Sequence, residues 1–471
     1  MVPERVAAVL AELAPVAERF EAAGHRVYLV GGAVRDLLLG RSLDEIDLDL
    51  TTDARPEETE AIVRPMADAV WLQGKRFGTI GWRRAGRDIE VTTHRADAYR
   101  PDSRKPDVRF AEAVEADLSR RDFTVNAMAL RLTASGDPAT AELVDPFGGA
   151  DDLAGSRLRT PLDPEVSFDD DPLRMLRAAR FVAGYGLQPV AALVAAIRAL
   201  HERLEIVSAE RIRDELDKLV TVERPSPGLA LLVETGAAQE FLPELPALAM
   251  AEDPAHRHKD VLAHTLAVVD RAGNDRLLRL AALFHDVGKP KTRSFGPGGK
   301  VSFHHHEVVG ARMTRERMGA LRYSAQDLDV VSRLVELHLR FHGYEDGEEG
   351  GWTDSAVRRY ARDAGPLLDR LNDLTRADCT TRNRRKAAAL AERMDRLELR
   401  IEALRESEEL AALRPDLDGN EVMAHLGLTP GREVGDALGF LKELRIEEGP
   451  LGPDEARRRL DEWWSARDNR Q

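Results

Sequence analysis

Apolar residues recur at intervals of three and four over most of the chain, which is the spacing of an amphipathic helix. The first such segment covers residues 3–23 and ends before Gly24, a residue suited to a helix C-cap. From about residue 151 the helical spacing continues into the C-terminal region, with breaks at prolines and glycines. The pattern therefore predicts a mainly α-helical protein.

The segment after Gly24 has a different pattern, which is rich in short strand-like runs. Helical spacing returns there at residues 33–39 and at about 56–69. The strand-like runs cover residues 27–30, 46–50, 79–82 and 89–93. Short strands interleaved with helices predict a small α/β sheet near the N-terminus.

Size and composition limit the class of protein further. A chain of 471 residues with 43% hydrophobic content is too long for one core, so we expect three or four domains. The single cysteine, Cys379, excludes an internal disulfide framework. No apolar run approaches the roughly 20 residues that span a bilayer, and the start Met-Val-Pro-Glu-Arg lacks the apolar core of a signal peptide. We expect a cytoplasmic protein with no membrane segment; the pattern favours no particular oligomeric state.

The net charge of −15 argues against nucleic-acid binding through the whole surface, because phosphate contacts need clustered Lys and Arg. A local basic groove is still compatible with this charge. Basic residues gather in two segments, residues 95–121 and 376–386. Arginines on ordinary solvated faces would give the same pattern.

A glycine pair follows the first predicted strand. Gly31 and Gly32 have no Cβ, so the backbone there can approach another group closely, and Arg35 lies just beyond them. Phosphate is the natural candidate for a ligand of such a turn. Tight turns without a ligand are commoner, so the pair alone is weak evidence.

The next predicted strand carries Asp47 and Asp49. Both carboxylates project to the same side, because strand residues alternate faces, and apolar residues such as Leu48 fill the other side. Paired carboxylates suit Mg²⁺, and two such ions can activate an attacking hydroxyl and stabilise a leaving pyrophosphate. Glu90 is a candidate third carboxylate, although an ordinary surface Glu fits nearly as well. A solvent-facing acidic edge strand is the alternative for the pair.

Three motifs then occur in a fixed order: residues 28–41 (Tyr-Leu-Val-Gly-Gly-Ala-Val-Arg-Asp-Leu-Leu-Leu-Gly-Arg), the Asp47 and Asp49 pair, and residues 120–128 (Arg-Arg-Asp-Phe-Thr-Val-Asn-Ala-Met). Together they resemble the bacterial class II CCA-adding tRNA nucleotidyltransferases and the related poly(A) polymerases. Further matching motifs lie at residues 145–149, 170–180 and 208–216.

The resemblance implies an α/β polymerase-beta-like nucleotidyltransferase head followed by a mainly α-helical neck, an HD-type body and a tail. Residues 417–464 resemble the family's tRNA-contacting tail, although the pair Trp463 and Trp464 equally suits a packing anchor. The expected boundaries are a head at residues 1–150, a neck with the nucleotide-selecting motif at 151–248, an HD-type domain at 249–390 and a tail at 391–471.

The resemblance also implies which side chains bind the nucleotide. In the family, the residues matching Arg121, Asp122 and Asn126 hold the ribose and triphosphate, which suits an Arg that forks onto phosphate and an Asp that accepts from a hydroxyl. The full set of expected nucleotide-binding residues is Gly31, Gly32, Arg35, Arg121, Asp122, Asn126, Asp171, Arg174, Arg177 and Arg180.

Asp171 and Arg174 lie three apart in a segment predicted to be helical, hence on one face. In the family this pair reads the base. Cytosine and adenine both offer an amine that Asp can accept from and a ring acceptor for Arg, whereas uracil and guanine present the opposite polarity. An ordinary surface ion pair is the alternative. Residues 95–118 are predicted to be a long loop beside the site; the family's flexible loop there permits the switch from C to A addition, and enzymes adding only CC lack it.

A second set of ligand residues is scattered through the helical half, around the run His-Asp-Val-Gly-Lys at residues 285–289. It resembles the HD metal-dependent phosphohydrolases. His304 and His305 compete with His306 as ligand. Imidazoles with carboxylates suit Mn, Ni, Co, Fe or Zn, and the resemblance implies hydrolysis of 2′,3′-cyclic or terminal phosphates; a scaffold that keeps its metal residues is the rival. The expected ligands are His264, His285, Asp286, His306, His338 and Asp378.

The leading hypothesis is template-independent addition of CCA to the tRNA 3′ end from CTP and ATP, with Mg²⁺ at Asp47 and Asp49 and release of pyrophosphate. The expected partners are therefore tRNA, CTP and ATP. A poly(A) polymerase or an A-adding tRNA nucleotidyltransferase is the close rival. A metal-dependent phosphohydrolase with an RNA-binding head is the rival of another class.

Overall fold

The computed structural model describes residues 4–41, 47–95, 98–100, 103–107, 110–250, 260–297, 301–343, 352–380, 384–408 and 415–468. The chain divides into two compact units, residues 1–246 and 247–471, and each is described by itself. The predicted division into four domains is finer than this and stays a prediction. The acidic glycine-rich residues 345–351 and Ile46 lie outside the described residues.

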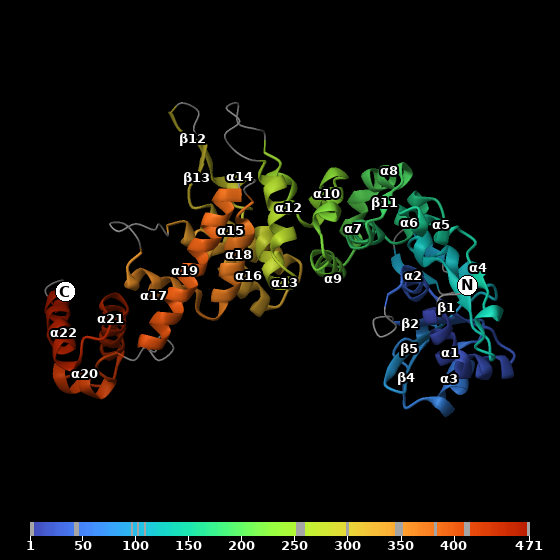
Figure 1. Cartoon of the computed structure of the whole chain (residues 1–471), viewed down its shortest axis with the longest axis horizontal. Coiled ribbons are helices and arrows are strands. Elements are labelled where there is room, and N and C mark those ends of the chain that lie inside the picture. Colours follow the sequence, from blue (N-terminus) through green and yellow to red (C-terminus); the bar gives the residue numbers. More distant parts are fainter. Residues whose placement is uncertain are drawn as a thin grey trace. The chain divides into compact units, whose positions relative to one another are not determined.

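The head is built on one sheet with helices against it (Figure 1). Its seven strands follow the order β3-β4-β5-β2-β1-β8-β9, with β2 and β5 parallel and the other neighbours antiparallel. The helices are α1 (Glu4–Ala22), α2 (Gly32–Leu39) and α3 (Pro56–Val63). The strands are β1 (Val27–Val30), β2 (Leu48–Thr52), β3 (Ala69–Trp71), β4 (Thr79–Arg84), β5 (Arg87–Thr93), β8 (Ala129–Arg131) and β9 (Leu143–Val144). The α/β head is therefore confirmed; β3, β8 and β9 were not predicted, because two or three residues are too short to show alternation.

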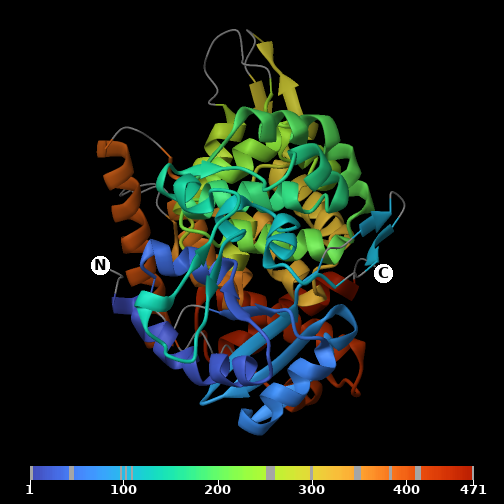
Figure 2. The same cartoon turned by 90° about the vertical axis from the view of Figure 1, so that its right-hand side faces the viewer.

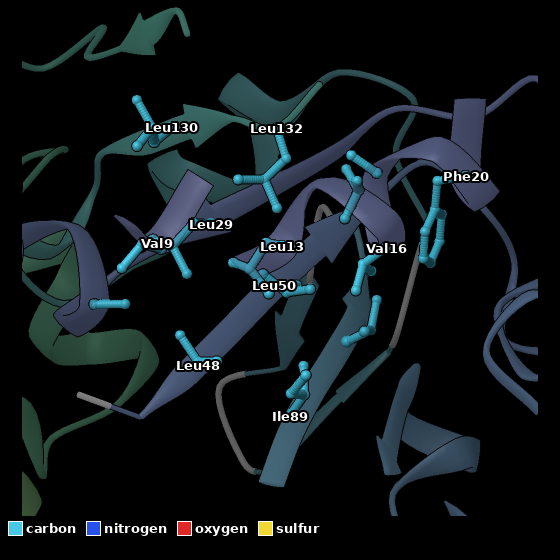
Figure 3. Close-up of a cluster of buried hydrophobic side chains, with 14 of the residues drawn as sticks. Val9, Leu13, Val16, Phe20, Leu29, Leu48, Leu50, Ile89, Leu130 and Leu132 are labelled. Carbon is cyan, nitrogen blue, oxygen red and sulfur yellow. The ribbon is translucent and has the colours of Figure 1, made fainter. Parts of the chain in front are cut away.

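One face of this sheet is covered by α1. Its apolar stripe packs on the inward residues of β1, β2 and β5, and Figure 3 shows these side chains interleaved. The side chains at this interface include Val9, Leu13, Val16, Leu29, Leu48, Leu50 and Ile89. Burial of this face anchors β2 and β5, so that their polar residues project from the opposite face.

The prediction of a long loop over residues 95–118 is wrong in part. Strands β6 (Ala98–Arg100) and β7 (Ser103–Asp107) form an antiparallel ribbon, and helix α4 covers Val114–Ser119. A bridge between Arg95 and Phe110 closes the base of this segment. Its polar and proline-broken sequence hid the strands, since it shows no apolar alternation.

The rest of the first unit is helical. It contains α5 (Gly149–Ala154), α6 (Pro164–Asp170), α7 (Arg174–Tyr185), α8 (Ala191–Leu200), α9 (Ala209–Val220), α10 (Ser226–Glu234) and α11 (Ala238–Phe241). Short parallel strands β10 (Arg157–Leu158) and β11 (Gln188–Pro189) lie among them. Proline at the first turn starts α6, and Gly186 in the left-handed conformation ends α7.

The second unit is helical apart from a hairpin. The hairpin strands β12 (Arg293–Phe295) and β13 (Val301–Phe303) project from the surrounding helices, as Figure 2 shows. The helices are α12 (Val261–Arg271), α13 (Arg276–Phe284), α14 (Lys289–Thr292), α15 (His306–Ala320), α16 (Ala325–Leu337), α17 (Asp354–Ala364), α18 (Leu368–Asp378) and α19 (Arg384–Glu408). No helix among the described residues is both long enough and apolar enough to span a membrane.

The last helices form a small core of their own. They are α20 (Gly419–Leu426), α21 (Arg432–Glu448) and α22 (Pro453–Asp468), packed around Val422, Leu441 and Leu460. Trp463 stacks on Phe440 with ring centroids 4.9 Å apart, so this Trp is a packing anchor.

Candidate functional site

The outward face of β2 and β5 carries a cluster of carboxylates. Asp49 pairs in register with Glu90 on the parallel neighbour, while the residues on either side of both are buried. Asp47 precedes β2 and is exposed. The structure thus brings together all three predicted carboxylates.

The charges of the neighbouring side chains shift the pKa of Asp49. The Asp49 side chain keeps contact with solvent. The surrounding protein atoms nevertheless remove part of the water around its carboxylate, and this desolvation raises its pKa to about 6. Arg121 opposes the rise, and the charges of Glu90 and Asp47 add to it. Like charges sharing one face are relieved by a divalent cation, and hard oxygen donors are the set that Mg²⁺ takes. The residues present therefore fit a metal site.

The glycine turn beside this face accommodates an arginine. Gly31 has φ +70°, and a Cβ built there would lie 2.6 Å from Arg121 Nη1. Glycine at this position therefore allows the guanidinium to lie against the backbone where α2 begins. This places a cation and helix N–H groups beside the carboxylates, which is the environment that a triphosphate needs.

Asp117, which the sequence analysis did not single out, holds that arginine. Its Oδ2 accepts from Arg121 Nε (3.3 Å) and Nη2 (3.0 Å), and its Oδ1 accepts from Arg120 and from the Arg95 backbone N–H. The carboxylate is completely buried; burial alone would raise its pKa, but Arg121 and Arg120 lower it to about 2. The sequence did hold a signal for this contact, because Arg120 and Arg121 follow Asp117 by three and four residues, the spacing of ion pairs on a helix.

Arg35 was predicted to meet phosphate, but its donors point at protein groups. It is buried, bonds both Asp36 oxygens (3.0 and 2.9 Å), donates to Asn126 Oδ1 (2.5 Å) and lies 4.2 Å from the Tyr185 ring centroid. Asn126 in turn donates to Asp122 Oδ1 at 3.0 Å. Arg35 therefore lies in a network that fixes Asn126, and its nucleotide contact stays a prediction.

The same network continues into α7. Arg177 forks onto Asp122 Oδ2 through Nε (2.8 Å) and Nη2 (2.5 Å). Burial would raise the pKa of Asp122, but Arg177 and Asn126 hold it well below its ordinary range. Arg180 bonds Glu215, a buried carboxylate of α9 that the sequence analysis did not single out. Arg177 and Arg180 are thus placed by the structure, while their contact with a nucleotide stays a prediction.

The premise that Asp171 and Arg174 share a helical face is wrong. Asp171 lies between α6 and α7 with φ −141° and ψ 95°, because it precedes Pro172, and the residue before a proline is pushed out of the helical region. Its carboxylate accepts from Arg211 Nη2 at 3.2 and 2.9 Å. Arg174 is buried and donates to Ser167 Oγ (2.8 Å) and to the Arg120 carbonyl (2.5 Å). The base-reading role of the pair remains a prediction.

The second unit brings its six predicted ligands together. His264 lies on α12, His285 and Asp286 follow α13, His306 starts α15, His338 follows α16, and Asp378 ends α18. His264 Nε2 lies 2.8 Å from Asp378 Oδ1 and 3.4 Å from His285 Nε2. Asp286 Oδ2 lies 3.2 Å from His285 Nε2, and Asp286 Oδ1 lies 3.4 Å from His306 Nε2.

A hydrogen bond at Nδ1 orients each of the four imidazole rings. Nδ1–H of His285, His306 and His338 donates to the carbonyls of Ala282, Phe303 and Val335 at 2.6–2.8 Å, and His264 Nδ1 is bonded to Thr380 Oγ1. Their Nε2 atoms therefore converge on one centre, as in metal-ligating histidines.

Two further facts support a metal centre here. Among the described residues, Nε2 of His306 and His338 is buried without a hydrogen-bond partner, and burial lowers the pKa of His338 to about 3, which keeps the ring in its neutral ligand form. The choice between three adjacent histidines is also resolved, since His304 and His305 are exposed and His306 faces Asp286. The residues fit a nitrogen-preferring transition metal.

Comparison with known proteins identifies the domains that carry the two candidate sites. Family models match in chain order: the poly A polymerase head domain at residues 27–159, the probable RNA and SrmB-binding site of polymerase A at 186–248, and the HD domain at 255–383. The A-adding tRNA nucleotidyltransferase of Deinococcus radiodurans is 33% identical over 449 residues, which is 92% of this chain and 95% of that protein.

The CCA-adding enzyme of Leuconostoc citreum is 38% identical over 221 residues, and the chain spans about half (52%) of that relative. The fold resembles that of the Bacillus stearothermophilus CCA-adding enzyme in complex with CTP (TM-score 0.68, 24% identity, 98% of this chain and 99% of that one). It also resembles the Thermotoga maritima CCA-adding enzyme complexed with tRNA (TM-score 0.58, 17% identity, 96% and 94%).

The fold and the carboxylate face define a metal-dependent nucleotidyltransferase with an appended HD domain. More particularly, the chain belongs to the family of tRNA nucleotidyltransferases and poly(A) polymerases.

Proposed function

We propose that this enzyme adds CCA to the 3′ end of tRNA, using CTP and ATP and releasing pyrophosphate. The observation that supports it best is the carboxylate face of Asp47, Asp49 and Glu90 beside Arg121 and the Gly31 turn. In such a site, Arg121 and the Gly31 turn would bind the phosphates of a nucleoside triphosphate, and the carboxylates would bind the metal ions that activate the attacking hydroxyl. The CCA-adding relatives, with their CTP and tRNA complexes, support the choice of substrates.

Asp47 and Asp49 would hold two Mg²⁺ ions, with Glu90 as the third oxygen ligand. Bound there, Mg²⁺ activates the 3′ hydroxyl and neutralises the leaving pyrophosphate. Arg121, held by Asp117, would contact the phosphates from the side of α2. Asp122 and Asn126 would then receive the ribose, since both belong to the network beside Arg121.

Nucleotide choice would rest on Asp171 and Arg174. Asp171 accepts from the exocyclic amine of cytosine or adenine, and Arg174 donates to the adjacent ring nitrogen. Both side chains are already held by protein partners, Asp171 by Arg211 and Arg174 by Ser167. Pre-oriented groups lose less entropy on binding and reject a base of opposite polarity more strongly.

The test is incorporation of labelled CTP into a tRNA that lacks CCA, with Mg²⁺ present. We expect two C residues and then one A when both nucleotides are supplied. Asp47→Asn and Asp49→Asn should abolish incorporation, whereas Asp88→Asn, an exposed carboxylate on the neighbouring strand, should not. Absence of any CTP incorporation by the wild type would exclude CCA addition.

A specific observation favours a second candidate, addition of A alone. One relative that matches over nearly the whole length is an A-adding enzyme. An A-adding enzyme would extend a tRNA ending in CC with ATP but would leave a tRNA without CC unchanged. The two tRNA substrates, tested side by side, therefore separate the two proposals.

We further propose that the HD centre binds a transition metal and hydrolyses phosphate esters, such as 2′,3′-cyclic or terminal phosphates. The converging Nε2 atoms of four histidines with Asp286 and Asp378 support this. His285→Ala should remove hydrolysis of a 2′,3′-cyclic nucleotide and spare nucleotide incorporation, and Asp49→Asn should do the reverse. Loss of both activities in either variant would contradict two independent sites.

A further inference from the structure

Asp171 is oriented from another part of the chain. It lies outside any helix, so no helical backbone fixes the direction of its side chain. Two donors reach its carboxylate: the Leu173 N–H, 3.3 Å from Oδ1, and Arg211 Nη2, 3.2 Å from Oδ1 and 2.9 Å from Oδ2. Arg211 belongs to α9, 40 residues further along the chain.

Arg174 does not share this support. Its guanidinium is buried and bonds Ser167 and the Arg120 carbonyl. The two predicted base-reading groups are therefore held by different elements, Arg174 from α6 and the Arg120 segment, and Asp171 from α9. Loss of Arg211 would release Asp171 and leave Arg174 in place.

We propose that Arg211 is a specificity-positioning residue, which fixes the Asp171 carboxylate for acceptance of the base amine. This inference rests on the proposed nucleotide addition. Arg is a permanent donor, and a carboxylate has about four acceptor positions, so the bond to Arg211 leaves room for the amine. Arg211 and Asp171 also remain partly exposed, which leaves the carboxylate accessible to a nucleotide.

The orientation of the Asp171 carboxylate matters because the enzyme would reject a wrong base by leaving this carboxylate without a hydrogen-bond donor. A fixed carboxylate facing the carbonyl of uracil or guanine stays unpaired and penalises that base. A carboxylate that can rotate finds water instead, and the penalty falls. Arg211→Gln should therefore lower kcat/KM for CTP and narrow the preference for CTP over UTP by about tenfold or more, the effect of roughly one hydrogen bond to a charged group.

The experiment measures kcat/KM for CTP, UTP, ATP and GTP on tRNA acceptors with the full-length enzyme. The variants are Arg211→Gln, Arg211→Lys and the control Arg213→Gln, which removes an arginine of the same helix that pairs with its neighbour Asp214. We expect Arg211→Lys to recover part of the preference and Arg213→Gln to keep it. The ratio is internal to each preparation, so partial misfolding does not change it.

A merely structural role gives a different result. Loss of Arg211 would then lower kcat/KM equally for all four nucleotides and leave the ratios between them unchanged. That result would refute the positioning role of Arg211, while incorporation by the wild type would still support the proposed function. In an Asp171→Asn background, Arg211→Gln should cause no further loss of preference, since the residue acts through Asp171. If the wild type adds only A, the ratio of kcat/KM for ATP to that for GTP replaces the CTP-to-UTP ratio in this test. A wild type that adds no nucleotide would refute both the positioning role of Arg211 and the proposed function.

Discussion

Asp117→Asn tests whether a buried carboxylate holds Arg121, the arginine proposed to contact the phosphates. Asp117 is fully buried and accepts from Arg120 and Arg121. Asparagine keeps the shape but removes the charge and turns an amide donor toward a guanidinium. Arg121 would then lose its anchor beside Gly31. We expect both a less stable head and weaker nucleotide binding.

The magnitude follows from the pKa of Asp117, which is lowered from 3.8 to about 2. Since one pKa unit corresponds to about 1.4 kcal/mol, the interactions of the charged form stabilise the folded state by about 2 kcal/mol. Removal of one partner from a buried ion pair costs about 3–5 kcal/mol. Both arginines keep some exposure to solvent, so we expect a loss of about 2–3 kcal/mol.

The pH dependence has a definite sign. The folded state lowers the pKa of Asp117, so its contribution is complete above about pH 4 and is lost as the pH falls toward 2. The difference in stability between wild type and variant should be constant at neutral pH and shrink over that acid range.

Hydrogen exchange followed by mass spectrometry measures this in the full-length protein. Peptides covering β4 and β5 report opening of the head, and we expect exchange about 30- to 150-fold faster in Asp117→Asn, as 2–3 kcal/mol implies. Asp88→Asn, which removes an exposed bidentate partner of Arg83, serves as the matched control and should change exchange far less. Equal exchange in Asp117→Asn and wild type, with unchanged KM for CTP, would refute this reasoning.

Three further substitutions have defined outcomes. Gly31→Ala places a methyl group 2.6 Å from Arg121 Nη1 at φ +70°, so KM for CTP should rise at least about tenfold, the equivalent of about 1.4 kcal/mol; steady-state kinetics would contradict this if KM stayed the same. Gly288→Ala places a methyl group 2.1 Å from the His306 carbonyl, which should destabilise the HD-containing unit by about 1–3 kcal/mol in calorimetry and spare incorporation. His338→Ala removes a buried imidazole of the proposed metal centre, so metal content by plasma mass spectrometry should fall while CTP incorporation persists, and undiminished metal would place the ion elsewhere.

The parts of the site that sequence could predict are those set by local periodicity. Alternation along one strand placed Asp49 on a face opposite Leu48, and the structure agrees. The buried and unpartnered Nε2 of His338 could be expected only in general terms, since the six candidate ligands lie on or beside five different helices. Pro172 was the overlooked local signal, because it takes Asp171 out of the helix.

The parts that sequence could not supply are partnerships between distant residues. The contact of Arg211 with Asp171 spans 40 residues, and that of Arg180 with Glu215 spans 35. No periodicity reports such pairs, because they depend on how the helices pack. Asp117 is intermediate, since its spacing to Arg121 was visible but its complete burial was not.

The histidine tethers have a consequence for metal exchange. His285, His306 and His338 are each held by the carbonyl three residues earlier. For His285 and His338 this carbonyl lies in the last turn of α13 or α16, and for His306 it ends strand β13. Their orientation therefore depends on the backbone and not on the ion, unlike that in small domains that fold only around zinc. A metal bound at such a centre would be able to leave and be replaced by another without unfolding the domain, so the ion bound there would follow the supply of metals in the cell.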